Sequence, residues 1–360
     1  MIPEDVDVAA TCAKSDRSNN PDLRKTAIDP DHWYPLARSA SLKSGKTLAV
    51  SFSGEPIVLV RTGSDVVFAL EDRCAHRQVP LHVGRVTGEH LQCGYHCWTY
   101  DRSGRCVNVP YLDGARSLPN GVRSYPCREA YGLIFVFTGS SARVASATFP
   151  DIPAHANPHY KTRYLDRRVR CHYSFMHENL MDMNHQFLHR KLMGSIRTEY
   201  LDLREGDGWV EVDYTFSRVA GKQPICEAFI IGGKQQSNTG RKIDLMTIRT
   251  GYPYQTLKFW PAGSDEPALD LWNVYVPTDR EQRANHTFGL MMVRKPSFPG
   301  LIHVMWPFII WFTEAIFAED RAIVEAEQRA FDYQGADWNQ EIFPVIQKLR
   351  KVLITRGIRG

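Results

Sequence analysis

Two short cysteine–histidine pairs constrain this chain more than any other feature of its sequence. The first pair is Cys74 and His76, and the second is Cys93 and His96. Together they offer two thiolates and two imidazoles within one short stretch. In a zinc finger both cysteines precede both histidines, whereas here each pair holds one residue of each type. The pattern predicts a four-ligand metal site whose ligands are divided between two loops.

The mixed pairs favour one kind of centre. In a Rieske [2Fe–2S] cluster two histidines replace two cysteines on one of the two irons. A structural zinc site and accidental clustering are the alternatives that the residues leave open. The surrounding residues, Cys74–Arg77 and Cys93–Asp101 followed by Gly104, resemble the Rieske domain of ring-hydroxylating, non-haem iron oxygenases. Ala75 and Cys97 depart from the family's usual Pro and Gly, but neither position supplies a ligand.

Length and composition narrow the class of protein. The chain has 360 residues, 43% hydrophobic and 23% charged, which is ordinary for a soluble globular protein of about two domains. A net charge of +4 without a basic block gives no reason to expect nucleic acid as a partner. The eight cysteines show no disulfide-like spacing, so we expect a reducing, cytoplasmic location. The apolar run 301–318 contains His303, Pro307 and Glu314, and we expect a buried helix or pocket wall there and no transmembrane span.

The order of sequence patterns predicts three segments. Residues 1–29 are expected to form an N-terminal arm, and the polar residues 1–27 are interpreted as an arm or a disordered tail. Residues 30–145 contain short β-rich runs between turns and predict a small all-β domain that carries both Cys-His loops. Residues 146–360 alternate six strands with helices near 172–191, 304–333 and 338–353. Strands with helices segregated against them predict an α+β fold.

A second candidate metal site lies in the predicted helix 172–191. On a regular helix, residues 178, 182, 185 and 189 share one face, so His185 and His189 could bind one ion with Asp182 beside them. A third ligand from a carboxylate would complete a 2-His-1-carboxylate triad, which suits non-haem Fe(II) that activates O2. Asp320 is the candidate, and Glu319 is its rival.

This region also resembles a known family. Asn179, Asp182, His185 and His189 resemble the mononuclear-iron motif of Rieske oxygenases, in the group of phthalate dioxygenase, vanillate O-demethylase and dicamba monooxygenase. The segment around Asp320 is similar to the one that carries their aspartate ligand. The family commonly has four residues between its two histidines, and this chain has three. The resemblance implies a helix-grip sheet with a long C-terminal helix, a homotrimer, and Asp182 as an electron bridge between the cluster and the iron.

The expected function follows from both sites. The resemblance implies a terminal oxygenase that uses O2 and takes electrons from NAD(P)H through a separate reductase, with or without a ferredoxin. It would hydroxylate, dihydroxylate or demethylate an aromatic or other cyclic hydrophobic small molecule, with a carboxylate as one option. The alternative is a Rieske electron-transfer protein, which would leave the second half of the chain unexplained. The residues expected to line the substrate pocket are apolar: Phe187, Leu192, Met193, Trp272, Met291 and Trp306.

Overall fold

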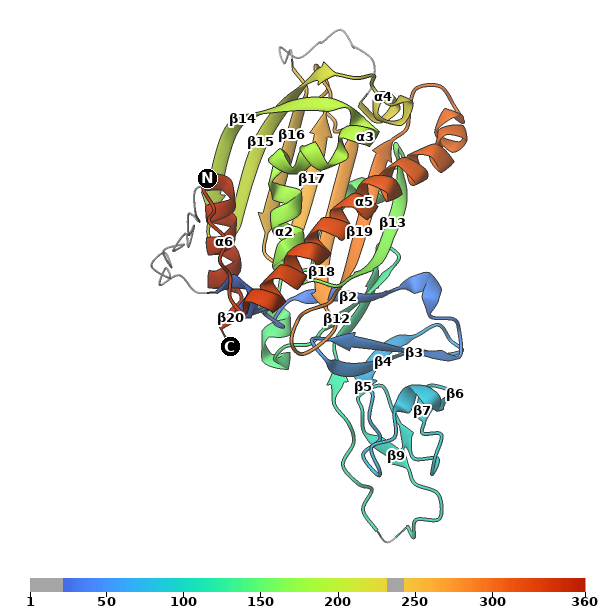
Figure 1. Ribbon diagram of the computed structural model, residues 1–360. Helices are drawn as coiled ribbons and strands as arrows, with labels where there is room; N and C mark the ends of the chain where they lie inside the picture. The colour runs from blue at the N-terminus through green and yellow to red at the C-terminus, as the bar shows by residue number, and fades with distance from the viewer. Residues whose placement is uncertain (1–21, 115, 232–242, 360) are drawn as a thin grey trace, which may run out of the picture.

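The computed structural model describes residues 22–114, 116–231 and 243–359. These residues form an N-terminal all-β domain and a C-terminal domain in which helices cover one face of a large sheet (Figure 1). The N-terminal domain, in blue and cyan, lies below the sheet in that view. This is the α+β architecture that the order of sequence patterns predicted.

The N-terminal domain contains three small antiparallel sheets. In the order of each sheet, the strands are β10 (Ser124–Tyr125), β5 (Val67–Glu71), β4 (Glu55–Arg61) and β3 (Lys46–Phe52); β11 (Cys127–Ala130), β12 (Leu133–Phe137) and β2 (Trp33–Arg38); and β6 (Arg85–Thr87), β7 (His90–Gln92), β8 (Thr99–Tyr100) and β9 (Cys106–Asn108). Short 3-10 turns connect them at η2 (Ser39–Ser41), η3 (Leu81–Val83) and η4 (Ser141–Ser146). Successive residues of β4 and β12 are buried, because both faces of these strands are covered.

The C-terminal domain is built on one seven-stranded antiparallel sheet. Its strand order is β13 (Tyr160–Val169), β19 (Asn285–Arg294), β18 (Leu269–Pro277), β17 (Tyr254–Trp260), β16 (Leu245–Gly251), β15 (Trp209–Ala220) and β14 (Ser195–Gly206). The helices are α1 (Pro153–Ala156), α2 (Tyr173–Met181), η5 (Met183–His189), α3 (Arg190–Met193), α4 (Ile225–Ile231), α5 (Leu301–Gln334) and α6 (Pro344–Arg356). Figure 1 shows α2, α3, α5 and α6 over the same face of the sheet.

The sequence pattern missed one strand of this sheet. The six expected strands are present, but β13 at the edge was not predicted. Its sequence is rich in arginine, so it lacks the alternation of apolar and polar residues that marks a half-buried strand. In the structure Arg163 donates to the Ile310 carbonyl oxygen at 2.9 Å, and the Arg167 guanidinium lies 4.0 Å from the centre of the Phe317 ring. These arginines attach the edge strand to α5.

Residues 1–27 were interpreted as an arm or a disordered tail, and the second interpretation is wrong for residues 22–27. Residues 1–21 lie outside the described residues. The chain then forms η1 (Leu23–Lys25) and β1 (Thr26–Ala27), and β1 pairs with β20 (Ile358–Arg359) near the C-terminus. Leu23 and Ile28 are buried. Two apolar residues in a polar segment are a weak sequence signal, and their packing in the main core became evident only in the structure.

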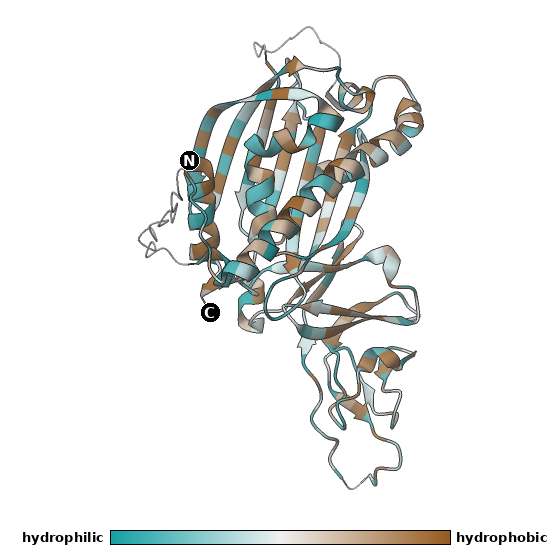
Figure 2. Cartoon of the chain, viewed as in Figure 1, coloured by the Kyte–Doolittle hydropathy of each residue, from teal (hydrophilic) through white to brown (hydrophobic). Residues whose placement is uncertain are grey.

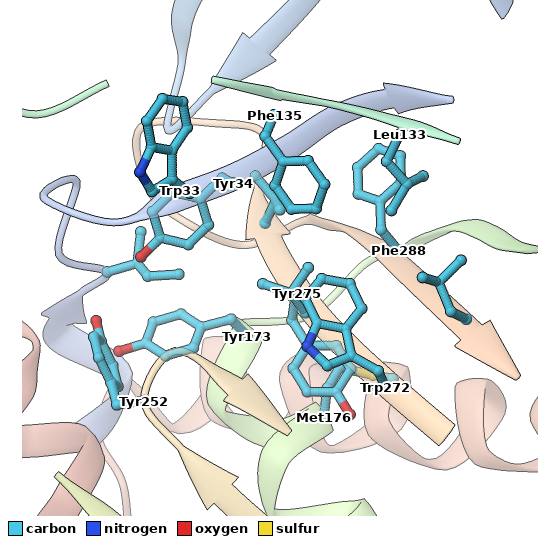
Figure 3. Close-up of a cluster of buried hydrophobic side chains, with 14 of the residues drawn as sticks. Trp33, Tyr34, Leu133, Phe135, Tyr173, Met176, Tyr252, Trp272, Tyr275 and Phe288 are labelled. Carbon is cyan, nitrogen blue, oxygen red and sulfur yellow. The ribbon is translucent and has the colours of Figure 1, made fainter. Parts of the chain in front are cut away.

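One hydrophobic core joins the two domains. Trp33, Tyr34 and Phe135 of the N-terminal domain belong to the same buried cluster as Trp272 and Tyr275 of the large sheet, and Trp272 faces Phe135 (Figure 3). The Phe135 and Trp272 ring centroids are 6.3 Å apart. Aromatic side chains bury large apolar areas, so this shared core favours a fixed arrangement of the two domains.

The long helix α5 is long and apolar enough to cross a membrane, by length and composition only. Figure 2 shows many hydrophobic residues along it. That test is weak evidence, because a helix that packs on a soluble domain can pass it. Ile302, Ile309, Phe312 and Val324 of α5 are buried. A membrane-spanning α5 would have to give up these contacts with the rest of the domain. Val304, Phe308 and Trp311 are exposed, so the expectation of a fully buried helix over 301–318 is wrong.

Gly104 provides a test of the loop packing near the Cys-His pairs. Its φ angle is +80°, and a Cβ there would lie 2.1 Å from the Val122 carbonyl oxygen. We predict that Gly104→Ala lowers the stability of the N-terminal domain by about 3 kcal/mol or more, through strain and steric clash. Gly88→Ala is the matched control, since Gly88 also has a positive φ but open space around it. It should lose only about 1 kcal/mol. Thermal unfolding followed by circular dichroism measures both, and equal losses would contradict the clash.

Candidate metal centres

The two cysteine–histidine pairs lie on two loops of the N-terminal domain, one after β5 and one after β7. Cys74 and Cys93 are each only 2% exposed and belong to the core of this domain. His76 and His96 lie nearer the surface, with ring centroids 4.5 Å apart. A Rieske cluster needs two thiolates for one iron and two imidazoles for the other. The grouping of thiols inside and imidazoles outside fits that requirement.

Two aromatic residues orient these ligands, and the sequence analysis assigned no role to either. The ring of His76 is stacked on Trp98, with centroids 4.6 Å apart and an angle of 4° between the planes. The Tyr100 hydroxyl lies 3.1 Å from Cys74 Sγ. Burial raises the pKa of Tyr100 far above its usual value, so the hydroxyl keeps its proton and can donate to a thiolate. Hydrogen bonds to sulfur are one of the factors that set a cluster's reduction potential.

Cys97 occupies a backbone conformation that favours glycine. Its φ angle is +56°, in the left-handed region. This geometry gives a physical reason for glycine at the matching position of related proteins. Its thiol is one of seven free cysteines in the described part of the chain.

The second candidate site does not lie on one continuous helix, and the prediction of a helix over residues 172–191 is wrong. The helix α2 ends at Met181, and Asp182 has an extended backbone with φ −88° and ψ 94°. A 3-10 helix, η5, then carries both His185 and His189. Asp182 therefore does not share a helical face with the histidines as expected. Its carboxylate instead accepts the Asn184 N–H at 2.9 Å and caps η5.

His185, His189 and Asp320 nevertheless come together. One ligand atom from each lies within 4.8 Å of the others, and no other group of this kind occurs in the described residues. His189 Nε2 lies 3.2 Å from Asp320 Oδ1, and His185 Nε2 lies 3.7 Å from the same oxygen. His189 Nε2 is buried without a hydrogen bond of suitable geometry. Because a buried polar atom normally has a partner, a bound cation fits this position.

Glu319 faces the other nitrogen of His189. Its Oε2 lies 2.8 Å from His189 Nδ1. Burial lowers the pKa of His189, but the neighbouring Asp320 and Glu319 outweigh this effect and raise the pKa. An Nδ1–H donated to Glu319 leaves the lone pair of Nε2 for a metal. Glu319, the rival of Asp320 in the sequence analysis, thus lies at Nδ1 of His189, where it can orient the ring, and Asp320 lies at Nε2.

Hydrogen bonds also orient Asp320 and His185, the other two residues of the candidate triad. Asn179 Nδ2 donates to Asp320 Oδ1 at 3.4 Å. The backbone carbonyl of Asp182 accepts a hydrogen bond from His185 Nδ1, which again directs Nε2 toward Asp320.

Two nearby histidines are separate from this group. Burial lowers the pKa of His172 and of His177 to about 3, so both are neutral. His172 bonds to Ser174 through Nδ1 at 2.7 Å, and His177 packs against Tyr275. Both stay inside the core that α2 forms with the sheet.

The residues expected at the substrate pocket divide between the two faces of the sheet. Met291 packs with Ile302 and Ile309 of α5, on the face that the helices cover. Tyr275 of β18 also points to this face, toward α2. Trp272, three residues earlier on the same strand, points to the opposite face because side chains alternate. It packs against Phe135, so its assignment to the pocket is wrong.

The other expected pocket residues lie on the helices. Leu192 and Met193 are half-buried on α3. Trp306 is half-buried on α5, with Lys161 Nζ 4.5 Å from its ring centre. Phe187 on η5 is 60% exposed. Their contact with a substrate stays a prediction.

Comparisons with known proteins match each of the two domains to a family model. Residues 32–126 match the family model described as Rieske [2Fe-2S] domain, and residues 169–345 match the model described as Vanillate O-demethylase oxygenase C-terminal domain. The chain belongs to the Rieske-type oxygenases. As such it is an oxidoreductase that uses a [2Fe–2S] cluster, mononuclear iron, O2 and electrons derived from a reductase to oxygenate or demethylate a small molecule.

Two relatives are similar to this protein over most of its length. It is 28% identical over 346 residues to the 4beta-methylsterol monooxygenase of Methylococcus capsulatus, covering 93% of this chain and 90% of that protein. It is 28% identical over 318 residues to the oxygenase component of dicamba O-demethylase from Stenotrophomonas maltophilia, covering 85% and 89%. Its fold matches the crystal structure of dicamba monooxygenase bound to dicamba with a TM-score of 0.73, at 24% identity over 91% of this chain and 98% of that one.

We predict that Glu319→Ala weakens binding of a divalent metal at the His185, His189 and Asp320 group by about 10- to 100-fold, because His189 loses the acceptor that orients its ring. Glu319→Gln keeps an acceptor oxygen and should lose less. Titration of Fe(II) into protein stripped of mononuclear metal measures both. Complete loss of binding in Glu319→Gln, with the cluster intact, would instead mean that Glu319 itself is a ligand.

Proposed function

We propose that this protein is a terminal oxygenase in which Cys74, His76, Cys93 and His96 hold the Rieske cluster, and His185, His189 and Asp320 hold Fe(II). The convergence of two imidazoles and one carboxylate on a common point is the observation that carries the second assignment. The bound iron would supply the site where O2 reacts with the substrate. Asn179 and Glu319 would keep Asp320 and His189 in place.

The substrate class is an aromatic or other cyclic hydrophobic small molecule. The names of the relatives include a methylsterol, dicamba and carbazole. The apolar packing of Met291, Ile302 and Ile309 between the sheet and α5 supports this proposal, since α5 also carries Asp320. Of the residues expected from sequence, Met291, Trp306, Leu192, Met193 and Phe187 remain candidates for substrate contact.

The working unit is a homotrimer in which the cluster of one subunit serves the iron of its neighbour. The loops with the Cys-His pairs lie at the end of the N-terminal domain that points away from α2 and α5 (Figure 1). Within one chain the two sites are therefore far apart. Asp182 is partly exposed beside His185 and would form the bridge to a histidine of the neighbouring cluster.

Electrons would come from NAD(P)H through a separate reductase, directly or by way of a ferredoxin, in the cytoplasm. The seven cysteines within the described residues are all free thiols, which supports a reducing compartment. The surface position of His76 and His96 supports electron entry at the tip of the N-terminal domain.

We predict that His185→Ala and Asp320→Ala each abolish turnover and leave the visible spectrum of the cluster unchanged. The reason is that either change removes an iron ligand in the C-terminal domain, distant from the cluster loops. Metal and sulfide analysis should give about three irons and two sulfides per chain for the wild type and about two of each for the variants. His172→Ala is a control for loss of a histidine outside the triad and should keep its mononuclear iron. Turnover in His185→Ala, or zinc without sulfide in the wild type, would refute the assignment.

Transfer between subunits has its own test. We predict that a cluster-deficient variant, Cys93→Ser, and an iron-deficient variant, His185→Ala, recover turnover when they are co-expressed, because a mixed trimer pairs an intact cluster with an intact iron site. Substrate-dependent O2 uptake measures this, with a surrogate reductase and a substrate found by screening cyclic acids, methyl ethers and sterols. The Cys93→Ser, His185→Ala double variant co-expressed with a second copy of itself is the inactive control. No recovery in verified mixed oligomers would show that electrons stay within one chain.

A further inference from the structure

A group of ion pairs lies where the N-terminal segment, α2 and α6 meet. Arg24 donates to the Glu178 carboxylate and to the Ser174 hydroxyl of α2. From the other side, Arg350 of α6 donates to Glu178 Oε1 at 2.9 Å and also pairs with Asp337. Each oxygen of the Glu178 carboxylate is therefore held by a different arginine. We call Arg24, Glu178 and Arg350 the arginine clamp.

The arginine clamp is largely shielded from water. The side chain of Arg24 is 1% exposed, and that of Glu178 is 14% exposed. The Arg24 guanidinium also lies 3.6 Å from the centre of the Phe175 ring. A buried ion pair adds little net stability, because the cost of desolvation offsets the attraction. Removing one partner of a buried pair is costly, however, because the other charge is left buried without a partner. The pairing therefore favours the arrangement of α2 in which Glu178 lies between the two arginines.

The two ends of the chain are required to build the clamp. Thr26 and Ala27 of β1 pair with Arg359 and Ile358 of β20, directly after α6. This pairing brings Arg24 close to the helix that carries Arg350. An N-terminal segment that sequence suggested was a free arm thus contributes a charge to the interior of the C-terminal domain.

Backbone hydrogen bonds connect Glu178 to the second metal centre. The Asp182 N–H donates to the Glu178 carbonyl oxygen at 2.9 Å, in the last turn of α2. The Asp182 carbonyl in turn accepts from His185 Nδ1. Asn179, the next residue after Glu178, donates to Asp320. Because α2 has only nine residues, a restraint at Glu178 controls the rotation of this last turn.

We propose that Glu178 is a positioning residue for the mononuclear iron site. Held between Arg24 and Arg350, it sets the last turn of α2 and thereby the places of Asp182, His185 and Asn179. The inference rests on the proposed function of the His185, His189 and Asp320 group. In addition, the geometry of this group would depend on the charges of Arg24 and Arg350. Neither arginine would touch the metal or the substrate.

The test uses Co(II), whose visible absorption reports the geometry of its ligands. Full-length protein with its cluster intact is stripped of mononuclear metal and titrated with Co(II). Glu178→Gln keeps the size of the side chain but removes the charge between the arginines. We expect its Co(II) affinity to fall about 10- to 100-fold and its visible bands to shift, while the cluster absorbance is unchanged.

Glu205→Gln is the matched control. It removes the ion pair of Glu205 with Lys348, which also links α6 to the sheet but is exposed to solvent. We expect wild-type Co(II) affinity and bands in this variant. Wild-type affinity and bands in Glu178→Gln would overturn the proposal. An equal loss in Glu205→Gln would overturn it too, because any ion pair of α6 would then have the same effect.

A second variant decides the case in which Glu178→Gln fails to fold. Arg350→Gln leaves Glu178 paired with Arg24, and we expect an intact cluster with a partial loss of Co(II) affinity. Unchanged affinity and bands in Arg350→Gln would overturn the proposal. Failure of the proposed function gives a different result: the wild type itself would bind no Co(II), or His185→Ala would bind it as well as the wild type does.

Discussion

The contact between α5 and the segment formed by α2 and η5 is the interaction on which the catalytic domain depends. It brings Asp320 and Glu319 against His185 and His189, although Glu319 and His189 are 130 residues apart along the chain. Both segments lie on the same face of the sheet and pack on it through apolar side chains. His189 is buried at this contact, and His185 and Asp320 are partly exposed beside it.

Each proposed site shows a division between ligands and the groups that orient them. In the N-terminal domain, Trp98 and Tyr100 restrain His76 and Cys74. In the C-terminal domain, Glu319 restrains His189, and the Asp182 carbonyl restrains His185. Trp98 and Asp182 lie outside regular secondary structure, whereas Tyr100 belongs to β8 and Glu319 to the interior of α5. Side chains of both domains share one aromatic core, which favours a fixed arrangement of the domains.

Three sequence predictions failed for related physical reasons. The helix over residues 172–191 is interrupted at Asp182, whose carboxylate caps the following turn and competes with a continuing helix. Trp272 was assigned to the pocket by its apolar character, which does not reveal the face of the sheet to which it points. Residues 22–27 were interpreted as part of an arm or a disordered tail because they are polar, but Arg24 is buried through ion pairs with residues far along the chain. Composition cannot reveal partners at that distance.

The sequence by itself determined the types and local spacing of the candidate ligands, the α+β class and six of the seven strands of the large sheet. Thiolates and imidazoles at short spacing, and alternating apolar residues, are local properties of a chain. Only the tertiary structure decided that Asp320 meets the histidines while Glu319 takes the other nitrogen of His189. The two carboxylates are adjacent on one helix, and the way α5 packs across the sheet selects which of them faces Nε2. The same holds for the arginine clamp, which exists only because the two ends of the chain pair with each other.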